Sequence, residues 1–116
     1  MAMADVQKAG TCQIGSAIGP VAVALKIDGG HVGVFSVVRS GSPLPHSPNG
    51  TVPLGNSNTL LGTTITVSTS LTKVAPGSQF NVKVQLRGLT CSVEAPGSFA
   101  TGATTAVVDV TVTFNA

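Results

Sequence analysis

The chain has 116 residues, a formal net charge of +2 and only 9% charged residues, against about 25% in an average soluble domain. Its length suits one domain with one hydrophobic core, and no apolar run approaches the roughly 18 residues of a membrane span, so we expect no membrane insertion. The six lysines and arginines are scattered and no basic cluster is interleaved with aromatics, so we expect no nucleic-acid partner.

The N-terminal residues Met1-Ala2-Met3-Ala4-Asp5 look like an added leader. We therefore expect residues 1–10 to be a leader or tail and residues 11–116 to form a single β-sandwich domain. A short strand is predicted at residues 11–14, ahead of a Gly19-Pro20 turn.

A β-hairpin is predicted next, because Asp28-Gly29-Gly30 separates two strand-like segments at residues 21–27 and 31–38. The first segment alternates large apolar with small or polar side chains. The second is apolar on both faces, with Val32, Val34 and Val38 on one face and Phe35 and Val37 on the other.

Residues 40–58 contain four prolines and three glycines and predict a long loop without regular structure. Loops of this kind often carry binding residues. The candidate binding residues of this loop are Pro43, Pro45, His46, Pro48, Asn49 and Pro53. Asn49-Gly50-Thr51 also matches the N-glycosylation sequon, but Asn-Gly is an ordinary turn pair and we favour a turn.

Strict period-two alternation predicts three further strands at residues 63–71, 79–87 and 105–114, and a shorter one is expected at 89–93. The turn at residues 74–78 leads either to an antiparallel neighbour or across to a second sheet. About seven short strands separated by turns are typical of an all-β sandwich. Two of the strands present outward rows of hydroxyl groups: Thr64, Thr66, Ser68 and Ser70 on one, and Thr105, Thr111 and Thr113 on the other.

A family resemblance rests on Thr64-Ile65-Thr66-Val67, on Val74-Ala75-Pro76-Gly77-Ser78 and on Gln79-Phe80-Asn81-Val82-Lys83-Val84. This run resembles the strand, Pro-Gly turn and strand of bacterial immunoglobulin-like surface domains. The resemblance implies an immunoglobulin-like antiparallel β-sandwich and assigns no functional residue; unlike antibody domains, the chain has neither Trp nor Tyr. Residues 105–114 are similar to the C-terminal strand of pilin-type sandwiches, which assemble by lending a strand to a neighbour.

The two cysteines, Cys12 and Cys91, are far apart in sequence and belong to no metal-binding or Cys-x-x-Cys pattern. They predict one long-range disulfide, and with it an extracellular, cell-surface or particle-surface location. The alternative is a pair of reduced, buried cysteines in a cytoplasmic protein.

Catalytic chemistry is not predicted, since the few titratable residues form no recognisable constellation. Asp28 falls in a turn, Asp109 lies among outward threonines, and His31 and His46 match no metal-ligand spacing. Gly-x-Ser-x-Gly is absent, and the glycine-rich segments do not open helices. We therefore expect no enzyme, no cofactor and no metal.

The leading functional hypothesis is a non-enzymatic surface module for adhesion, protein–protein binding or structural assembly, acting through sheet faces, sheet edges or the 40–58 loop. Low charge removes a usual barrier to edge pairing, which favours a protein partner or self-association. One alternative is a carbohydrate-binding module that binds a glycan through the hydroxyl rows or the loop, although the lack of Trp and Tyr counts against it. Another is an enzyme inhibitor acting through the 40–58 loop.

Overall fold

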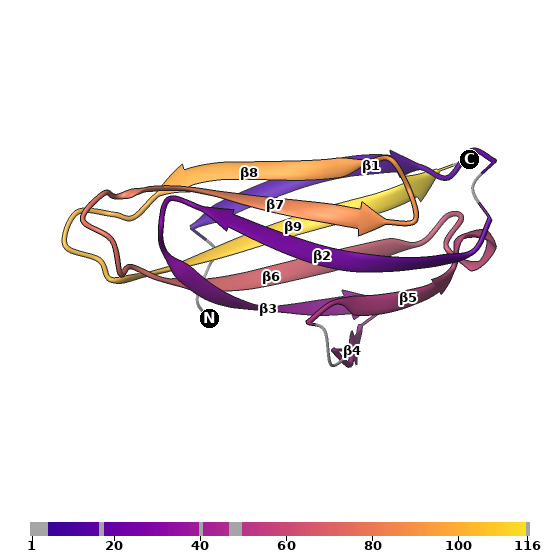
Figure 1. Cartoon of the computed structure of the whole chain (residues 1–116), viewed down its shortest axis with the longest axis horizontal. Coiled ribbons are helices and arrows are strands. Elements are labelled where there is room, and N and C mark those ends of the chain that lie inside the picture. Colours follow the sequence, from indigo (N-terminus) through magenta and orange to yellow (C-terminus); the bar gives the residue numbers. More distant parts are fainter. Residues whose placement is uncertain (1–4, 17, 40, 47–49, 116) are drawn as a thin grey trace.

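Two β-sheets packed face to face form the protein in a computed structural model that describes residues 5–16, 18–39, 41–46 and 50–115 (Figure 1). This confirms the all-β sandwich, with nine strands in these residues where about seven were predicted. The elements are β1 (Val6–Gln13), β2 (Pro20–Asp28), β3 (Val32–Arg39), β4 (Ser42–Leu44), β5 (Val52–Asn56), the 3-10 helix η1 (Ser57–Thr59), β6 (Thr64–Thr72), β7 (Gln79–Arg87), β8 (Ser92–Ser98) and β9 (Thr105–Asn115).

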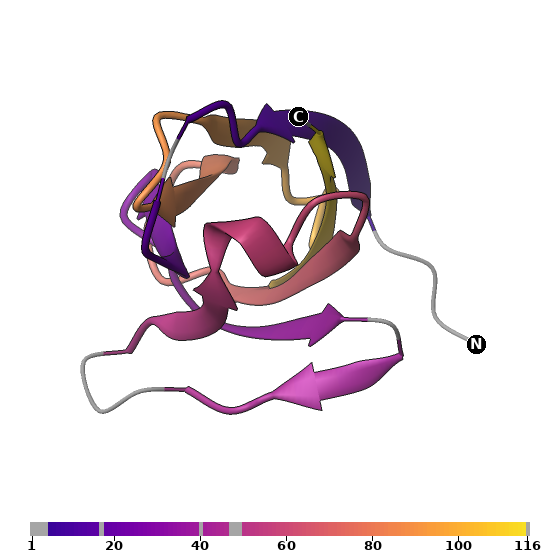
Figure 2. The same cartoon turned by 90° about the vertical axis from the view of Figure 1, so that its right-hand side faces the viewer.

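The five-stranded sheet has the order β1-β9-β6-β3-β4, and the four-stranded sheet has the order β5-β2-β7-β8. Figure 2 shows the sandwich from one end, with β3 and β4 at its lower margin. Neighbouring strands run antiparallel with one exception. β1 runs parallel to β9, from Val6 opposite Val108 to Gln13 opposite Asn115. β9 thus has β1 on one edge and β6 on the other, so both of its edges are paired within its own chain.

The core includes the inward side chains of β6, β7 and β9, which show the clearest alternation, as predicted, together with buried residues of β2, β3, β5 and β8. Every second residue of β6, β7 and β9 is buried because the side-chain period of a strand is two. Each fully buried large apolar side chain contributes roughly 1.5–3 kcal/mol relative to exposure. The inward apolar residues are Ile65, Val67 and Leu71 on β6, Phe80, Val82, Val84 and Leu86 on β7, and Ala106, Val108, Val110, Val112 and Phe114 on β9.

The expected boundary between tail and domain at residues 10 and 11 is wrong, since it falls inside β1. Residues 6–10 extend the parallel ladder with β9, and Asp5 adds a hydrogen bond from the Val107 N–H to its carboxylate at 2.7 Å. The segment shows no apolar alternation because β1 is an edge strand, whose outward residues meet water. The strand is held by backbone hydrogen bonds to β9, and these do not require a recognisable pattern of side chains.

The predicted β2–β3 hairpin is also wrong, because β2 and β3 belong to different sheets. The turn between them crosses the sandwich. Gly29 makes the crossing at φ +112°, and a Cβ there would lie 2.5 Å from the carbonyl oxygen of Gln79. The turn at residues 74–78 likewise carries the chain from β6 in one sheet to β7 in the other, which decides between the two outcomes expected there.

Residues 40–58 are not one structureless loop. They hold β4, which pairs with the end of β3, and β5, which pairs with the start of β2. Both strands lie at sheet edges, where proline costs no ladder hydrogen bond on the open side. Pro43 lies opposite Val38 and Pro53 opposite Ala22, and both prolines are exposed. The prediction of a loop was wrong because the sequence does not distinguish prolines and glycines in short edge strands from those in loops.

β8 begins at Ser92, later than the predicted strand at residues 89–93, and continues through Pro96 and Gly97. Both residues predict a turn in isolation. As an edge strand, β8 accommodates the proline. The glycine is required by close packing, since a Cβ at Gly97 would lie 2.6 Å from Val6 and 2.9 Å from the Phe80 ring. In the described part of the chain, no helix is long and apolar enough to cross a membrane.

Candidate functional site

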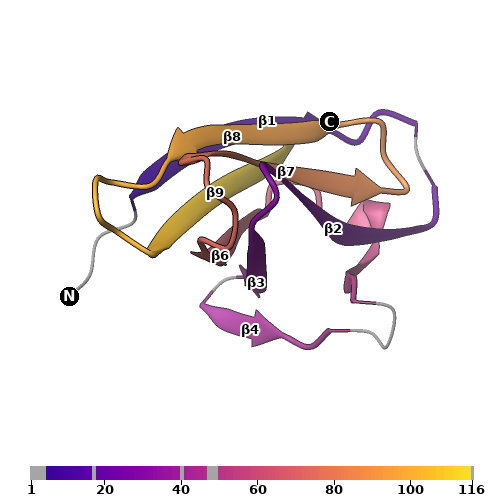
Figure 3. The same cartoon turned by 60° about the vertical axis from the view of Figure 1, so that its left-hand side comes forward.

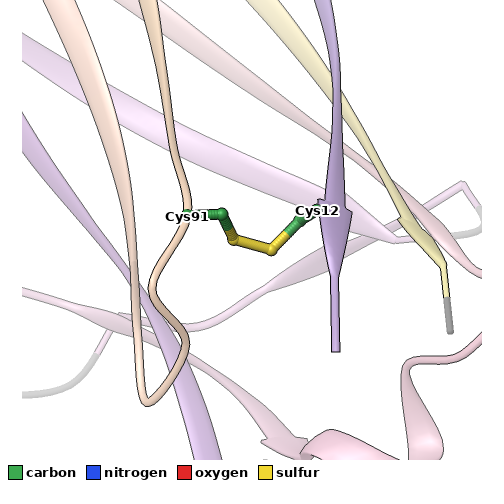
Figure 4. Close-up of a disulfide and its surroundings, with 2 residues drawn as sticks. All are labelled: Cys12 and Cys91. Carbon is green, nitrogen blue, oxygen red and sulfur yellow. A yellow bond between two sulfur atoms is a disulfide. The ribbon is translucent and has the colours of Figure 1, made fainter. Parts of the chain in front are cut away.

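One side of the sandwich is closed by a disulfide between Cys12 in β1 and Cys91 just before β8 (Figure 4). The two Cα atoms are 5.7 Å apart, within the range of protein disulfides, and the predicted pairing is confirmed. The bond joins the edge of the five-stranded sheet to the edge of the four-stranded sheet. Beside it, Gly10 lies so close to Val93 that a Cβ would be 2.7 Å from a valine methyl carbon.

The opposite side is held by Arg39 at the end of β3. Its guanidinium donates hydrogen bonds to the backbone carbonyls of Leu54 at 3.1 Å and Thr59 at 3.0 Å. The two acceptors lie in β5 and η1, which are joined to the other sheet. No role for Arg39 was predicted from the sequence. Its position could have indicated one, because a cation stands there at an inward position of the strand, after Phe35 and Val37.

The two histidines lie in separate places. His31 is 6% exposed, and its Nδ1 accepts hydrogen bonds from the backbone N–H groups of Val74 and Ala75 at 3.3 and 3.4 Å. Its ring meets Phe99 edge to face at 4.8 Å. His31 therefore organises the crossing turns at one end of the sandwich. Among the residues that the structure describes, no group of three or more His, Cys, Asp or Glu is placed to hold a metal.

The candidate binding residues of the 40–58 loop are divided between the two sheets. Pro43, Pro45 and His46 lie in or just after β4, all three exposed, and the His46 ring packs edge to face on Phe35 at 4.8 Å. Pro53 lies on β5, in the other sheet. Pro48 and Asn49, and with Asn49 the sequon, lie outside the described residues. Figure 3 shows β4 beside β3, apart from the body of the sandwich.

The two predicted rows of hydroxyls lie side by side, because β6 and β9 are neighbours in register. Thr64 stands opposite Thr113, with their hydroxyl oxygens 3.2 Å apart, and Thr66 stands opposite Thr111. We call this surface the hydroxyl face. It comprises the outward residues Thr64, Thr66, Ser68, Ser70 and Thr72 of β6 and Thr105, Val107, Asp109, Thr111 and Thr113 of β9, of which Val107 is apolar.

The hydroxyl face continues onto β3, whose outward residues Val32, Val34 and Val38 form a valine stripe. Val34 is 73% exposed and Val32 is 56% exposed, which are high values for apolar side chains on a sheet. Within the described ranges, β4 pairs only with the last three residues of β3. The apolar second face that the sequence indicated for this strand is therefore present; it is exposed at Val32 and Val34 and half-buried at Val38.

Charge is divided unequally between the two outer faces. The outward positions of β1, β3, β6 and β9 carry a single charged side chain, Asp109, as far as the described residues show. Its Oδ1 atom is buried without a hydrogen-bond partner. The outer face of the four-stranded sheet carries five charges: Lys26, Asp28, Lys83, Arg87 and Glu94.

Comparison with protein-family models, with curated protein sequences and with solved structures found no match to this chain.

Proposed function

We propose that the chain is a non-enzymatic structural module of a cell or particle surface, and that it assembles with further copies of itself through the hydroxyl face and the valine stripe. The observation that carries this proposal is the contrast between the two outer faces. The face of the five-stranded sheet has exposed valines and one charge, whereas the other face has five charges. Depletion of charge with exposed apolar residues is the composition of interface cores.

A second copy is the occupant that this composition favours. In a two-fold interface the same patch meets itself, so the one charge of this face, Asp109, can meet only its own copy or a neutral group. A face with a single carboxylate meets little repulsion in such a pairing. The uncharged valine stripe also lacks the lysines that commonly protect β-strands from contact with other chains. The disulfide supports the proposed location, because disulfides persist in oxidising compartments.

The test is light scattering coupled to size-exclusion chromatography over a range of concentrations. We expect the average mass to rise with concentration for the wild type. Val34→Glu places a charge in the valine stripe and should keep the protein monomeric. The matched control is Ile18→Glu, because Ile18 is 98% exposed and lies before β2 of the other sheet, next to Gly19, whose carbonyl accepts a hydrogen bond from Ser57. The proposal is overturned by a wild type that stays monomeric at every concentration, or by equal effects of the two variants.

A further inference from the structure

A hollow of about 410 Å³ lies on the outer face of the four-stranded sheet, away from the proposed assembly face. Its side chains come from three adjacent strands. The register places Asp28 of β2, Asn81 of β7 and Pro96 of β8 in one row across the sheet. Gln79 and Glu94 flank this row on the same face, so two carboxylates, two primary amides and one proline ring surround the hollow.

One acceptor in this hollow is unsatisfied. The Oδ1 atom of Asn81 is buried and has no hydrogen-bond partner among the described residues. A buried acceptor without a donor costs roughly 1–3 kcal/mol. The atom is covered in the unliganded protein, but the Asn81 side chain is half-buried, and rotation of its amide would turn the oxygen toward the hollow. A ligand that carries N–H or O–H groups would then supply the missing donor.

The width of the hollow disfavours a single metal ion. Asp28 and Glu94 lie on strands separated by β7, and two strand spacings amount to about 9–10 Å between backbones. Calcium holds its oxygen ligands at about 2.3–2.6 Å, so both carboxylates could bind one ion only within about 5 Å of each other. A ligand that bonds to both sides must therefore carry several polar groups spread over a ring or short chain.

The chemistry of the side chains selects a neutral polyhydroxyl ligand. Carboxylates accept hydrogen bonds from hydroxyl groups, and primary amides both donate and accept, as sugar hydroxyls require. Lys83 lies directly opposite Glu94 and Lys26 lies next to Asp28 along the same face of β2, so the charges around the hollow balance and favour a neutral ligand. The Pro96 ring provides an apolar surface for the C–H face of a sugar ring, in place of an exposed Trp or Tyr, because the chain has neither and Phe80, which also lines the hollow, is buried.

We infer that the hollow formed by Asp28, Gln79, Asn81, Glu94 and Pro96 is a binding site for a single neutral sugar residue. Binding is weak, roughly in the millimolar range, because the hollow is shallow and its one aromatic residue, Phe80, is too buried to stack on the sugar. This site and the proposed assembly face belong to different sheets, so either can fail without the other.

The test is a titration followed by two-dimensional ¹H–¹⁵N NMR with the methyl glycosides of glucose, galactose, mannose and N-acetylglucosamine. At least one of them should shift the amide signals of Gly29, Asn81 and Glu94 in a saturable way. Glu94→Gln should weaken that binding by about tenfold, since a charge-assisted hydrogen bond is replaced by a neutral one. Asp5→Asn changes the net charge equally beside β9 of the other sheet, where its carboxylate accepts a hydrogen bond from the Val107 N–H, and should bind as the wild type does.

Calcium chloride and arginine amide serve as competing probes. The inference is overturned if none of the four glycosides shifts these signals, or if only calcium or the arginine amide does. It is also overturned if Glu94→Gln binds sugar as tightly as the wild type. The signals outside the hollow report in the same spectra whether each variant keeps the fold.

Discussion

The guanidinium of Arg39 on β3 donates a hydrogen bond to the backbone carbonyl of Leu54 on β5 at 3.1 Å, and so joins the two sheets on the side opposite the disulfide. A second hydrogen bond reaches Thr59 at 3.0 Å. Both bonds use the fixed fork of the guanidinium, which holds two carbonyls at once. The two sheets are thus joined on both sides of the sandwich, by the Cys12–Cys91 disulfide on one side and by the Arg39 hydrogen bonds on the other.

Removing the Arg39 guanidinium should weaken the contact between the two sheets and lower the stability of the protein. Arg39→Met keeps the apolar stem and removes both hydrogen bonds, so we expect the free energy of unfolding to fall by about 1–3 kcal/mol. The free energy of unfolding of Arg39→Lys should lie between those of the wild type and Arg39→Met, because an ammonium group cannot donate to both carbonyls in the geometry of the guanidinium. Urea unfolding measures these values. Arg87→Met, at an exposed position of β7, is the control and should change stability by no more than about 0.5 kcal/mol.

The disulfide should resist alkylation and contribute strongly to stability. Mass measurement after thiol alkylation without reduction should show no modified cysteine. The bond closes a separation of 79 residues, which corresponds to roughly 4.5 kcal/mol in the chain-entropy model, and measured values are commonly about 2–4 kcal/mol. The double variant Cys12→Ala and Cys91→Ala should therefore unfold at lower urea concentration. Incorporation of two alkyl groups into the unreduced protein would contradict this account.

Substitutions of His31 test how much its contacts with the crossing turns contribute to stability. His31→Phe keeps a ring beside Phe99 but removes the acceptor for the Val74 and Ala75 N–H groups. The two hydrogen bonds are long, so we expect a loss of about 1–2 kcal/mol. His31→Asn places an oxygen near the position of Nδ1 and should restore the hydrogen bonds while losing the ring contact. A double-mutant cycle with Phe99→Leu separates the two effects.

Thr69 offers a stabilising substitution. It is fully buried on the inner face of β6, and its Oγ1 atom has no hydrogen-bond partner in the described structure. Thr69→Val replaces the hydroxyl with a methyl group of similar shape, so we expect a gain of about 1–2 kcal/mol in thermal or urea unfolding. Thr72→Val, at an exposed position of the same strand, should have little effect. A destabilised Thr69→Val variant would argue against an unsatisfied hydroxyl.

Deletion of residues 1–10 tests whether this segment is a dispensable N-terminal tail or a structural strand of the sheet. A tail could be removed without cost. In the structure the deletion removes five residues of β1, their ladder with β9 and the hydrogen bond between Asp5 and Val107. At roughly 1 kcal/mol for each hydrogen bond, a loss of a few kcal/mol is expected. Unchanged thermal unfolding of the shortened protein would show that the parallel ladder contributes nothing.

The strands that could be predicted are those buried on one face. In β6, β7 and β9 every inward residue except Thr69 is apolar, and the outward positions tolerate a hydroxyl or amide, so the bounds of these strands were predicted to within a residue. β1, β4, β5 and β8 lie at sheet edges. There backbone pairing decides the structure, and residues such as Pro43, Pro53 and Pro96 are tolerated although they predict turns.

The candidate surfaces were only partly predictable. The two rows of hydroxyls and the apolar second face of residues 31–38 were identified from alternation, but nothing in the sequence shows that β6 lies between β9 and β3. The hollow at Asn81 was missed entirely. Its side chains come from β2, β7 and β8, and Asp28 looked like an ordinary turn residue.

By itself, the sequence determined the all-β class, the single core, the Cys12–Cys91 pairing and the outward face of each central strand, because these depend on side-chain period and cysteine count. Only the tertiary structure decided that Asp28-Gly29-Gly30 crosses between sheets and that residues 6–10 pair in parallel with β9. It alone brought the valine stripe beside the hydroxyl face. The physical reason is that alternation specifies which side of a strand is buried, whereas the choice of neighbouring strand depends on the packing of the whole chain.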